Sequence, residues 1–152
     1  MASLCKESGR VVALDIQHEA VEQTKAHIAK LGLESQVSVY LADHQHIDRF
    51  ASPNSVDAIV FNFGWLPGGD HTVFTRAQTS ILAIQKGLGL LKPGGLMTLC
   101  IYYGRECGFE ERDALLEYVK TMDAKTYSVL VCQFANRTNC PAIPVLIYKR
   151  TV

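Results

Sequence analysis

Short runs rich in β-branched residues alternate along this chain with longer segments of helical periodicity. The first run, Val11–Leu14, ends at Asp15 and is followed by apolar residues at helical spacing as far as Gly32. A second run, Val37–Leu41, closes just before Asp43. Alternation of this kind is typical of strand–helix–strand units, so the sequence predicts an α/β fold with a mainly parallel sheet.

The same alternation continues to the end of the chain. We predict the remaining elements in this order: a strand at 58–61, a helix at 72–91, a strand at 96–102, a helix around 109–122, and strands at 127–134 and 145–149. Lys92-Pro93-Gly94-Gly95 is expected to form the turn that ends the longer helix. The last two strands have no helix between them, so they should pair antiparallel.

Composition narrows the class of protein. The 152 residues, 48% hydrophobic and 20% charged, are expected to form a single domain over 1–152. Fifteen basic and fifteen acidic residues give no overall field that would hold a polyanion, so an RNA partner would have to meet a local patch. Five cysteines without Cys-x-x-Cys spacing favour reduced thiols and a cytoplasmic protein. No apolar run approaches the roughly 20 residues that span a bilayer, so no membrane partner is expected.

Acidic residues stand where the first two predicted strands end, which is where open α/β sheets bind ligands. Asp15 offers two acceptor oxygens that match the vicinal hydroxyls of a ribose. Its alternative role is to cap the turn into the following helix. Asp43, followed by His44, can accept from an adenine amino group, or it can simply cap the next turn.

The most unusual stretch is Asn62-Phe-Gly-Trp-Leu-Pro-Gly-Gly-Asp-His71, directly after a buried strand. Its glycines permit close backbone approach, and Asn62 offers both a donor and an acceptor to a substrate. Alternatively, Trp65 packs on the core and Asp70 caps the next helix. His44, His46 and His71 lack the spacing of a metal site, so no metal is predicted.

Taken in order, these segments resemble class I S-adenosylmethionine-dependent methyltransferases. The matching segments are Val-Ala-Leu-Asp15, Ala-Asp43-His44, Asp57-Ala-Ile-Val-Phe-Asn62, Leu-Lys-Pro-Gly-Gly95 and the closing strand pair. The stretch ending at His71, and Ile-Tyr-Tyr-Gly104 followed by Glu110-Glu111-Arg-Asp113, are similar to the small bacterial family of putative rRNA methylases. That family includes the tRNA 5-(aminomethyl)-2-thiouridine methyltransferase.

The resemblance implies a role for each matching residue and S-adenosyl-L-methionine as the cofactor. Asp15 would bind the ribose, Gln17 would lie near the methionine or ribose edge, and Asp43 and His44 would flank the adenine. Asn62 would be a catalytic residue that faces both the methyl donor and the acceptor, and with Gly64 it would also belong to the cofactor site. Asp70 and His71 are the candidates for receiving a proton. The residues expected to line the acceptor side are Leu66, Pro67, Gly68, Gly69, Tyr102, Tyr103 and Gly104.

The resemblance also implies an expectation about the start of the chain. Members of the family open with a strand and a glycine-rich loop that wraps the methionine portion, whereas this sequence starts near the end of the helix that follows. We therefore expect a sheet lacking the usual first strand and helix, and weak binding of the cofactor. A homodimer is one way to cover the exposed sheet edge.

The function expected from these residues is methyl transfer to RNA. The substrate would be tRNA or another RNA, and the specific expectation is N-methylation of the 5-aminomethyl group of wobble 2-thiouridine. One alternative is a nucleoside-binding remnant that transfers nothing or is weakly active. Others are an rRNA or small-molecule methyltransferase and a nucleotide-dependent oxidoreductase.

Overall fold

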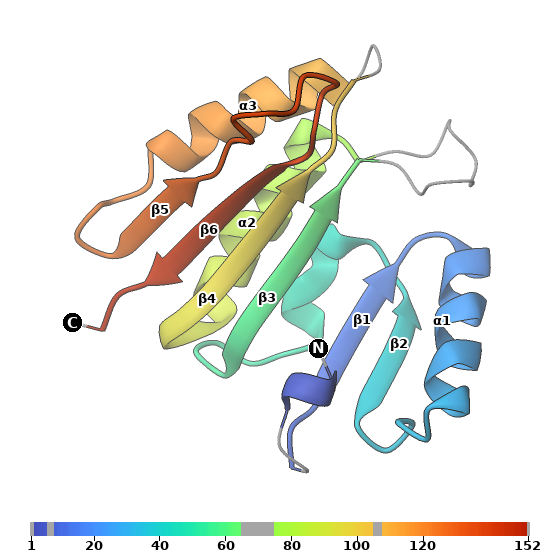
Figure 1. The fold of residues 1–152 in the computed structure, drawn as a ribbon. Coiled ribbons are helices and arrows are strands. Elements are labelled where there is room, and N and C mark those ends of the chain that lie inside the picture. Colours follow the sequence, from blue (N-terminus) through green and yellow to red (C-terminus); the bar gives the residue numbers. More distant parts are fainter. Residues whose placement is uncertain (1, 6–7, 65–74, 105–107, 152) are drawn as a thin grey trace. The chain divides into compact units, whose positions relative to one another are not determined.

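The computed structural model describes residues 2–5, 8–64, 75–104 and 108–151. The chain forms two compact units, Met1–Phe50 and Ala51–Val152, whose elements are labelled in Figure 1. Each unit is described by itself.

The first unit is a strand–helix–strand arrangement with a parallel pair of strands. Its elements are the short 3₁₀ helix η1 (Ala2–Leu4), β1 (Val11–Asp15), α1 (His18–Lys30), β2 (Val37–Leu41) and the 3₁₀ helix η2 (His44–Arg49). Val11 lies opposite Val37, and Asp15 lies opposite Leu41. The two strands therefore end side by side, as the sequence predicts.

Helix α1 follows from its sequence pattern. Its apolar side chains at helical spacing are turned inward, and the buried ones are Ala20, Val21 and Ile28. His18 and His27 are exposed, as predicted for helix-surface residues. Gly32 has a positive φ of 66°, which a glycine adopts without steric cost, and Leu33 donates a backbone hydrogen bond to Ile28 at 3.2 Å. The predicted glycine stop is confirmed.

The second unit contains a four-stranded sheet with the order β3-β4-β6-β5. Its elements are β3 (Val56–Phe63), α2 (Ala77–Leu90), β4 (Leu91–Ile101), α3 (Gly108–Lys120), β5 (Tyr127–Val131) and β6 (Ile143–Lys149). Strands β3 and β4 are parallel, whereas β6 runs antiparallel to both of its neighbours, β4 and β5. The last strand is thus inserted between two earlier ones.

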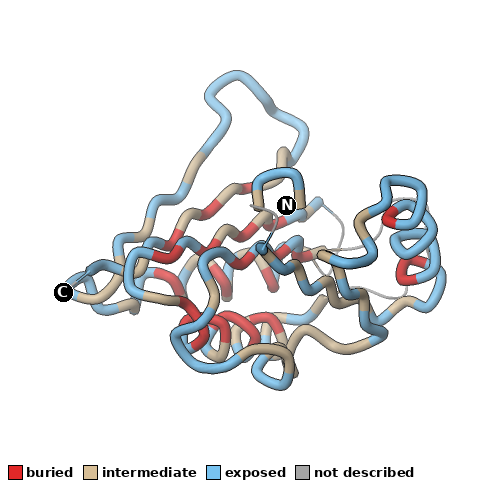
Figure 2. The backbone as a smooth tube through the Cα atoms, turned by 90° about the horizontal axis from the view of Figure 1, so that it is seen from below, coloured by how far each residue is buried: buried red, intermediate tan, exposed pale blue. Residues whose placement is uncertain are grey.

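Helices α2 and α3 cover one face of this sheet (Figure 1). Alternate side chains of strands β3, β4 and β6 point to that face and are buried, and Figure 2 shows these positions in red. The buried apolar residues of these strands are Ile59, Phe61, Phe63, Leu91, Met97, Leu99, Ile101, Ile143, Val145 and Ile147. Burial of such side chains contributes about 1.5–3 kcal/mol each, so this layer fixes the register and direction of the strands.

The structure corrects several element boundaries. Strand β4 begins at Leu91, earlier than predicted, because Leu91 pairs with Val56 before an irregularity in register. Residues 92–95 therefore lie inside the strand as a bulge and do not form a separate turn. Helix α2 begins at Ala77, and the predicted start near Thr72 falls outside the described residues. The antiparallel pairing of the closing strands is confirmed.

We predict that Gly87 on α2 is required for the close approach of this helix to the sheet. A Cβ at Gly87 would lie 2.7 Å from Met97 Cε and 3.3 Å from Ile59 Cδ1, whereas a Cβ at Gly89 would meet nothing within 4 Å. Gly87→Val should therefore lower the free energy of unfolding by about 1–3 kcal/mol in urea denaturation. The matched Gly89→Val should leave it unchanged or slightly higher. Equal losses in the two variants would contradict the prediction.

Candidate functional site

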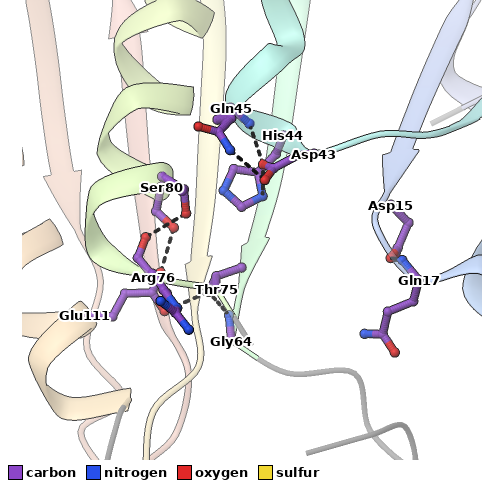
Figure 3. Close-up of polar contacts among 11 residues, drawn as sticks. Asp15, Gln17, Asp43, His44, Gln45, Gly64, Thr75, Arg76, Ser80 and Glu111 are labelled. Atoms are coloured by element: carbon purple, nitrogen blue, oxygen red, sulfur yellow. Dashed lines mark hydrogen bonds and ion pairs between the residues drawn. The ribbon is translucent and has the colours of Figure 1, made fainter. Parts of the chain in front are cut away.

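Asp15 and Asp43 come from neighbouring strand ends of the first unit. The backbone N–H of Ala42 donates to the carbonyl oxygen of Asp15 at 2.9 Å, which holds the end of β2 beside the end of β1. Asp15 Oδ1 accepts a hydrogen bond from the backbone N–H of Gln17 at 2.8 Å (Figure 3). This turn uses only one carboxylate oxygen, so Oδ2 retains its lone pairs for a ligand hydroxyl.

Asp43 is held at the start of η2 by Gln45. Its Oδ1 accepts from the Gln45 backbone N–H at 2.9 Å, and its Oδ2 accepts from the Gln45 side-chain amide at 2.7 Å. Burial, the largest influence, acts to raise the pKa of Asp43, but the two Gln45 hydrogen bonds and the nearby His44 and His46 outweigh it and lower the pKa. His44 Nδ1 lies 3.9 Å from Asp43 Oδ1. The carboxylate is therefore anionic at neutral pH and fixed in direction.

In the second unit, Asn62 and Gly64 stand at the carboxyl end of β3. Asn62 is exposed between the buried Phe61 and Phe63, and it lies opposite Cys100 of β4. Gly64 has a φ of 138°, and a Cβ there would lie 2.8 Å from the Cβ of Tyr102. Only glycine fits this position, because it removes both the backbone strain and the clash.

Tyr102, the first of the three predicted residues after β4, lies beside this strand end. Its backbone N–H donates to the carbonyl of Phe63 at 2.8 Å. A side-chain hydrogen bond and an electrostatic interaction with Cys100, together with burial, raise the pKa of Tyr102, so its phenol stays neutral at physiological pH. The Arg112 guanidinium lies over the ring of Tyr103, 4.8 Å from its centroid. Through Arg112, helix α3 thus holds the ring of Tyr103, the residue before Gly104.

Two hydrogen bonds also join Gly64 to Thr75, which lies eleven positions later in the chain. Its N–H donates to Thr75 Oγ1 at 2.7 Å, and its carbonyl accepts from the Thr75 N–H at 3.0 Å. The Thr75 hydroxyl donates onward to Glu111 Oε2 at 2.7 Å, and Ser80 donates to Glu111 Oε1 at 2.6 Å (Figure 3). Glu111 is only 4% exposed. The end of β3 is therefore tied to a buried carboxylate on α3.

The predicted site residues fall into two groups. Asp15, Gln17, Asp43 and His44 lie at the adjacent strand ends of the first unit. Asn62, Gly64 and the residues from Tyr102 to Gly104 lie together in the second unit. The other predicted residues are outside the described part of the chain: Leu66, Pro67, Gly68, Gly69, Asp70 and His71.

The sequence did not point to four polar residues that the structure brings into these groups. Gln45 orients Asp43, while Thr75, Ser80 and Glu111 make the network behind Gly64. Glu111 stood in the sequence only as part of a family-like motif. An Asp followed two positions later by Gln is a recognisable turn signal, but nothing local links residues 36 positions apart.

The described residues contain no group of three or more His, Cys, Asp or Glu side chains arranged to hold a metal ion. Of the helices in the same ranges, none is long and apolar enough to cross a membrane. Cys5, Cys100, Cys132 and Cys140 are free thiols.

Comparison with known families adds to this geometry. A family model described as "Putative rRNA methylase" matches residues 11–148, which is most of the chain and includes both groups of site residues. The chain belongs to the putative rRNA methylase family. The predicted family is thereby confirmed, and with it the α/β, Rossmann-like fold class of class I methyltransferases.

Three proteins are similar to this rRNA methylase family member over most of its length. A putative rRNA methylase from Clostridium thermocellum is 42% identical, with a TM-score of 0.93 over 97% of this chain and 79% of that one. A putative methyltransferase from Streptococcus mutans, solved with SAH, is 34% identical, with a TM-score of 0.84 over 92% of this chain and 76% of that one. The chloroplastic tRNA (mnm(5)s(2)U34)-methyltransferase of Arabidopsis thaliana is 31% identical over 92% of this chain. The chain covers 52% of that plant protein, so it spans about half the length of this curated relative.

We predict that the Asp43 carboxylate makes the stability of the first unit depend on pH. Its pKa is lowered in the folded protein, so its stabilising effect is present above the unfolded-state pKa of about 4 and is lost as pH falls through the folded-state pKa. Asp43→Asn should therefore lower the unfolding midpoint at pH 7, and the difference from wild type should shrink below pH 4.

The matched variant Gln45→Met removes the side-chain bond to Asp43 and keeps the bond from the Gln45 backbone N–H. The pKa of Asp43, followed by carboxyl NMR, should rise in this variant but stay below that of an unfolded chain. An identical Asp43 pKa in wild type and Gln45→Met would show that the side-chain hydrogen bond does not lower the pKa of Asp43.

Proposed function

We propose that residues 1–152 form a single methyltransferase domain that uses S-adenosyl-L-methionine to methylate RNA. The observation that carries the proposal is the placement of polar residues at the carboxyl ends of parallel strands in a member of the rRNA methylase family. The SAH held by the Streptococcus mutans relative supports the choice of cofactor.

The residues of the first unit fit the nucleoside part of this cofactor. Asp15 keeps Oδ2 for the ribose hydroxyls while Oδ1 holds the turn through Gln17. Asp43 is oriented by Gln45, and each of its oxygens has a second lone pair for a donor such as the adenine amino group. We assign Gln17 to the ribose or methionine edge and His44 to the adenine.

We assign the acceptor to the strand ends of the second unit. Asn62 is exposed, and Gly64 brings its backbone close to Tyr102. We assign Tyr103 and Gly104, which follow Tyr102 in the chain, to acceptor binding, and we assign residues 66–69 to the same role. The name of the Arabidopsis thaliana relative, a tRNA (mnm(5)s(2)U34)-methyltransferase, favours the wobble 5-aminomethyl-2-thiouridine of tRNA as the acceptor. The nucleophile would then be a primary amine.

The proposed chemistry is an in-line transfer from sulfur to nitrogen. The cofactor, when bound, supplies a methyl group made electrophilic by the positive sulfur. The Asn62 side-chain oxygen accepts a hydrogen bond from the neutral amine and so aims its lone pair, which is catalysis by orientation. Tyr102 lines the acceptor side with a neutral phenol. Asp70 or His71 receives the proton that the methylated amine releases, and no metal takes part.

We also propose that the protein forms a homodimer and is cytoplasmic. A homodimer would cover a free sheet edge, and a cytoplasmic location agrees with the free thiols of the described cysteines. Sedimentation of the purified protein tests the dimer independently of its activity.

We predict that Asp15 determines cofactor affinity. Asp15→Asn keeps an acceptor for the Gln17 N–H but removes the charged acceptor that faces the hydroxyls. Binding of S-adenosylhomocysteine, measured by calorimetry, should weaken about tenfold or more. Asp57→Asn is the control, because Asp57 is highly exposed and pairs with Lys92 near the start of β3, away from the carboxyl end of that strand. Equal affinities for wild type and Asp15→Asn would contradict the ribose assignment.

We predict that Asn62 acts in methyl transfer and contributes little to cofactor binding. Asn62→Ala should lower turnover about tenfold to a hundredfold with labelled S-adenosylmethionine and bulk tRNA from a strain lacking this modification. Affinity for S-adenosylhomocysteine should stay within about twofold of wild type.

The same assay separates the competing functions. Labelling of rRNA in place of tRNA would overturn the tRNA assignment and retain the methyltransferase. Binding of S-adenosylhomocysteine with no transfer to any RNA would favour the nucleoside-binding alternative. Unchanged turnover in Asn62→Ala would remove the role given to this side chain.

A further inference from the structure

Glu111 is a buried carboxylate for which the proposed chemistry has no use. It lies in the first turn of α3 and is 4% exposed. Burying a carboxylate costs several kcal/mol unless its oxygens are well bonded, so a residue of this kind is retained where the bonds it accepts matter. Both oxygens accept from hydroxyl groups, one from Thr75 and one from Ser80.

Ser80 and Thr75, whose hydroxyls donate to Glu111, link this carboxylate to different parts of the second unit. Ser80 lies within α2, so its bond joins one helix to another. The Thr75 hydroxyl, in contrast, donates to Glu111 and also accepts from the backbone N–H of Gly64. Among the described residues, the Thr75 branch is the one that joins the network to the strand end carrying Asn62.

The position of Gly64 is restrained from two sides. On one side, Tyr102 leaves no room for a Cβ, and the Tyr102 N–H is bonded to the adjacent Phe63 carbonyl. On the other side, Thr75 bonds both the N–H and the carbonyl of Gly64. A hydroxyl that donates to a carboxylate is polarised, which strengthens the bond that it accepts from the Gly64 N–H.

We propose that Glu111 is a positioning residue, which acts through Thr75 to fix the backbone of Gly64 and, with it, the direction of the Asn62 side chain. This proposal rests on the proposed function, because it concerns how Asn62 is aimed at the acceptor. Ser80 completes the hydrogen bonding of the buried carboxylate but does not contribute to the aim. The two hydroxyls therefore differ in function although they bind the same group.

This difference supplies a matched test. Thr75→Val preserves shape but removes the bond to Glu111 and the acceptor for Gly64. Ser80→Ala removes the other bond to the same carboxylate. Both variants should lose stability in urea denaturation, because each deprives Glu111 of one donor. Only Thr75→Val should lower kcat for methyl transfer, by about tenfold, with the KM for S-adenosylmethionine within about twofold of wild type.

Two conservative variants complete the series. Thr75→Ser keeps the hydroxyl and should restore kcat to near the wild-type value. Glu111→Gln keeps the shape but replaces one acceptor oxygen by an amide nitrogen, so its kcat should fall less than that of Thr75→Val. Equal losses of kcat in Thr75→Val and Ser80→Ala, or a failure of Thr75→Ser to restore it, would overturn the proposal in favour of a purely structural network.

An NMR measurement keeps the test independent of turnover. In Thr75→Val, the Gly64 amide should exchange with solvent faster and the Asn62 side-chain amide signals should shift, while Ser80→Ala should leave both near wild type. A wild-type protein that methylates no RNA would refute the proposed function but leave these signals readable. Unmoved Gly64 and Asn62 signals in Thr75→Val would refute the positioning role itself.

Discussion

Burial of one face of the β3-β4-β6-β5 sheet against α2 and α3 is the constraint on which the second unit depends. Because side chains alternate along a strand, sealing one face fixes which residues point away from it. Asn62 is exposed for this reason, since its neighbours Phe61 and Phe63 are both committed to the buried face. The chemistry proposed for Asn62 therefore depends on packing that lies on the opposite side of the sheet.

The first unit reaches a comparable result by hydrogen bonding. Its two strands are short; Asp15 is the last residue of β1, and Asp43 follows the end of β2 by two positions. Asp15 and Asp43 each accept a backbone N–H from two positions ahead, so each carboxylate closes its own turn while presenting a fixed charge. Capping and ligand binding were alternatives when only the sequence was considered. The geometry makes them compatible, because a carboxylate has more lone pairs than a turn consumes.

Periodicity predicted the elements that bury one stripe or face. The strand that carries Asn62 and the core of α2 were predicted because their apolar spacing is a direct consequence of burial. The strand ending at Asp15 was predicted from its β-branched run, although none of its residues is fully buried. The start of β4 was missed because Pro93 and two glycines normally indicate a turn, whereas here they form a bulge in a paired strand. The link from Thr75 to Glu111 was also missed, since it joins residues that only the tertiary fold brings together.

The insertion of β6 between β4 and β5 has a consequence for how the chain acquires its structure. The strand that fills the gap follows both of its neighbours in the sequence, so β4 and β5 must wait for it, each with an unsatisfied backbone edge. On a ribosome, the second unit cannot complete its sheet until residues 143–149 have emerged. A partly synthesised chain therefore exposes strand edges prone to pairing with other chains, and this period of vulnerability ends only when its last strand is in place.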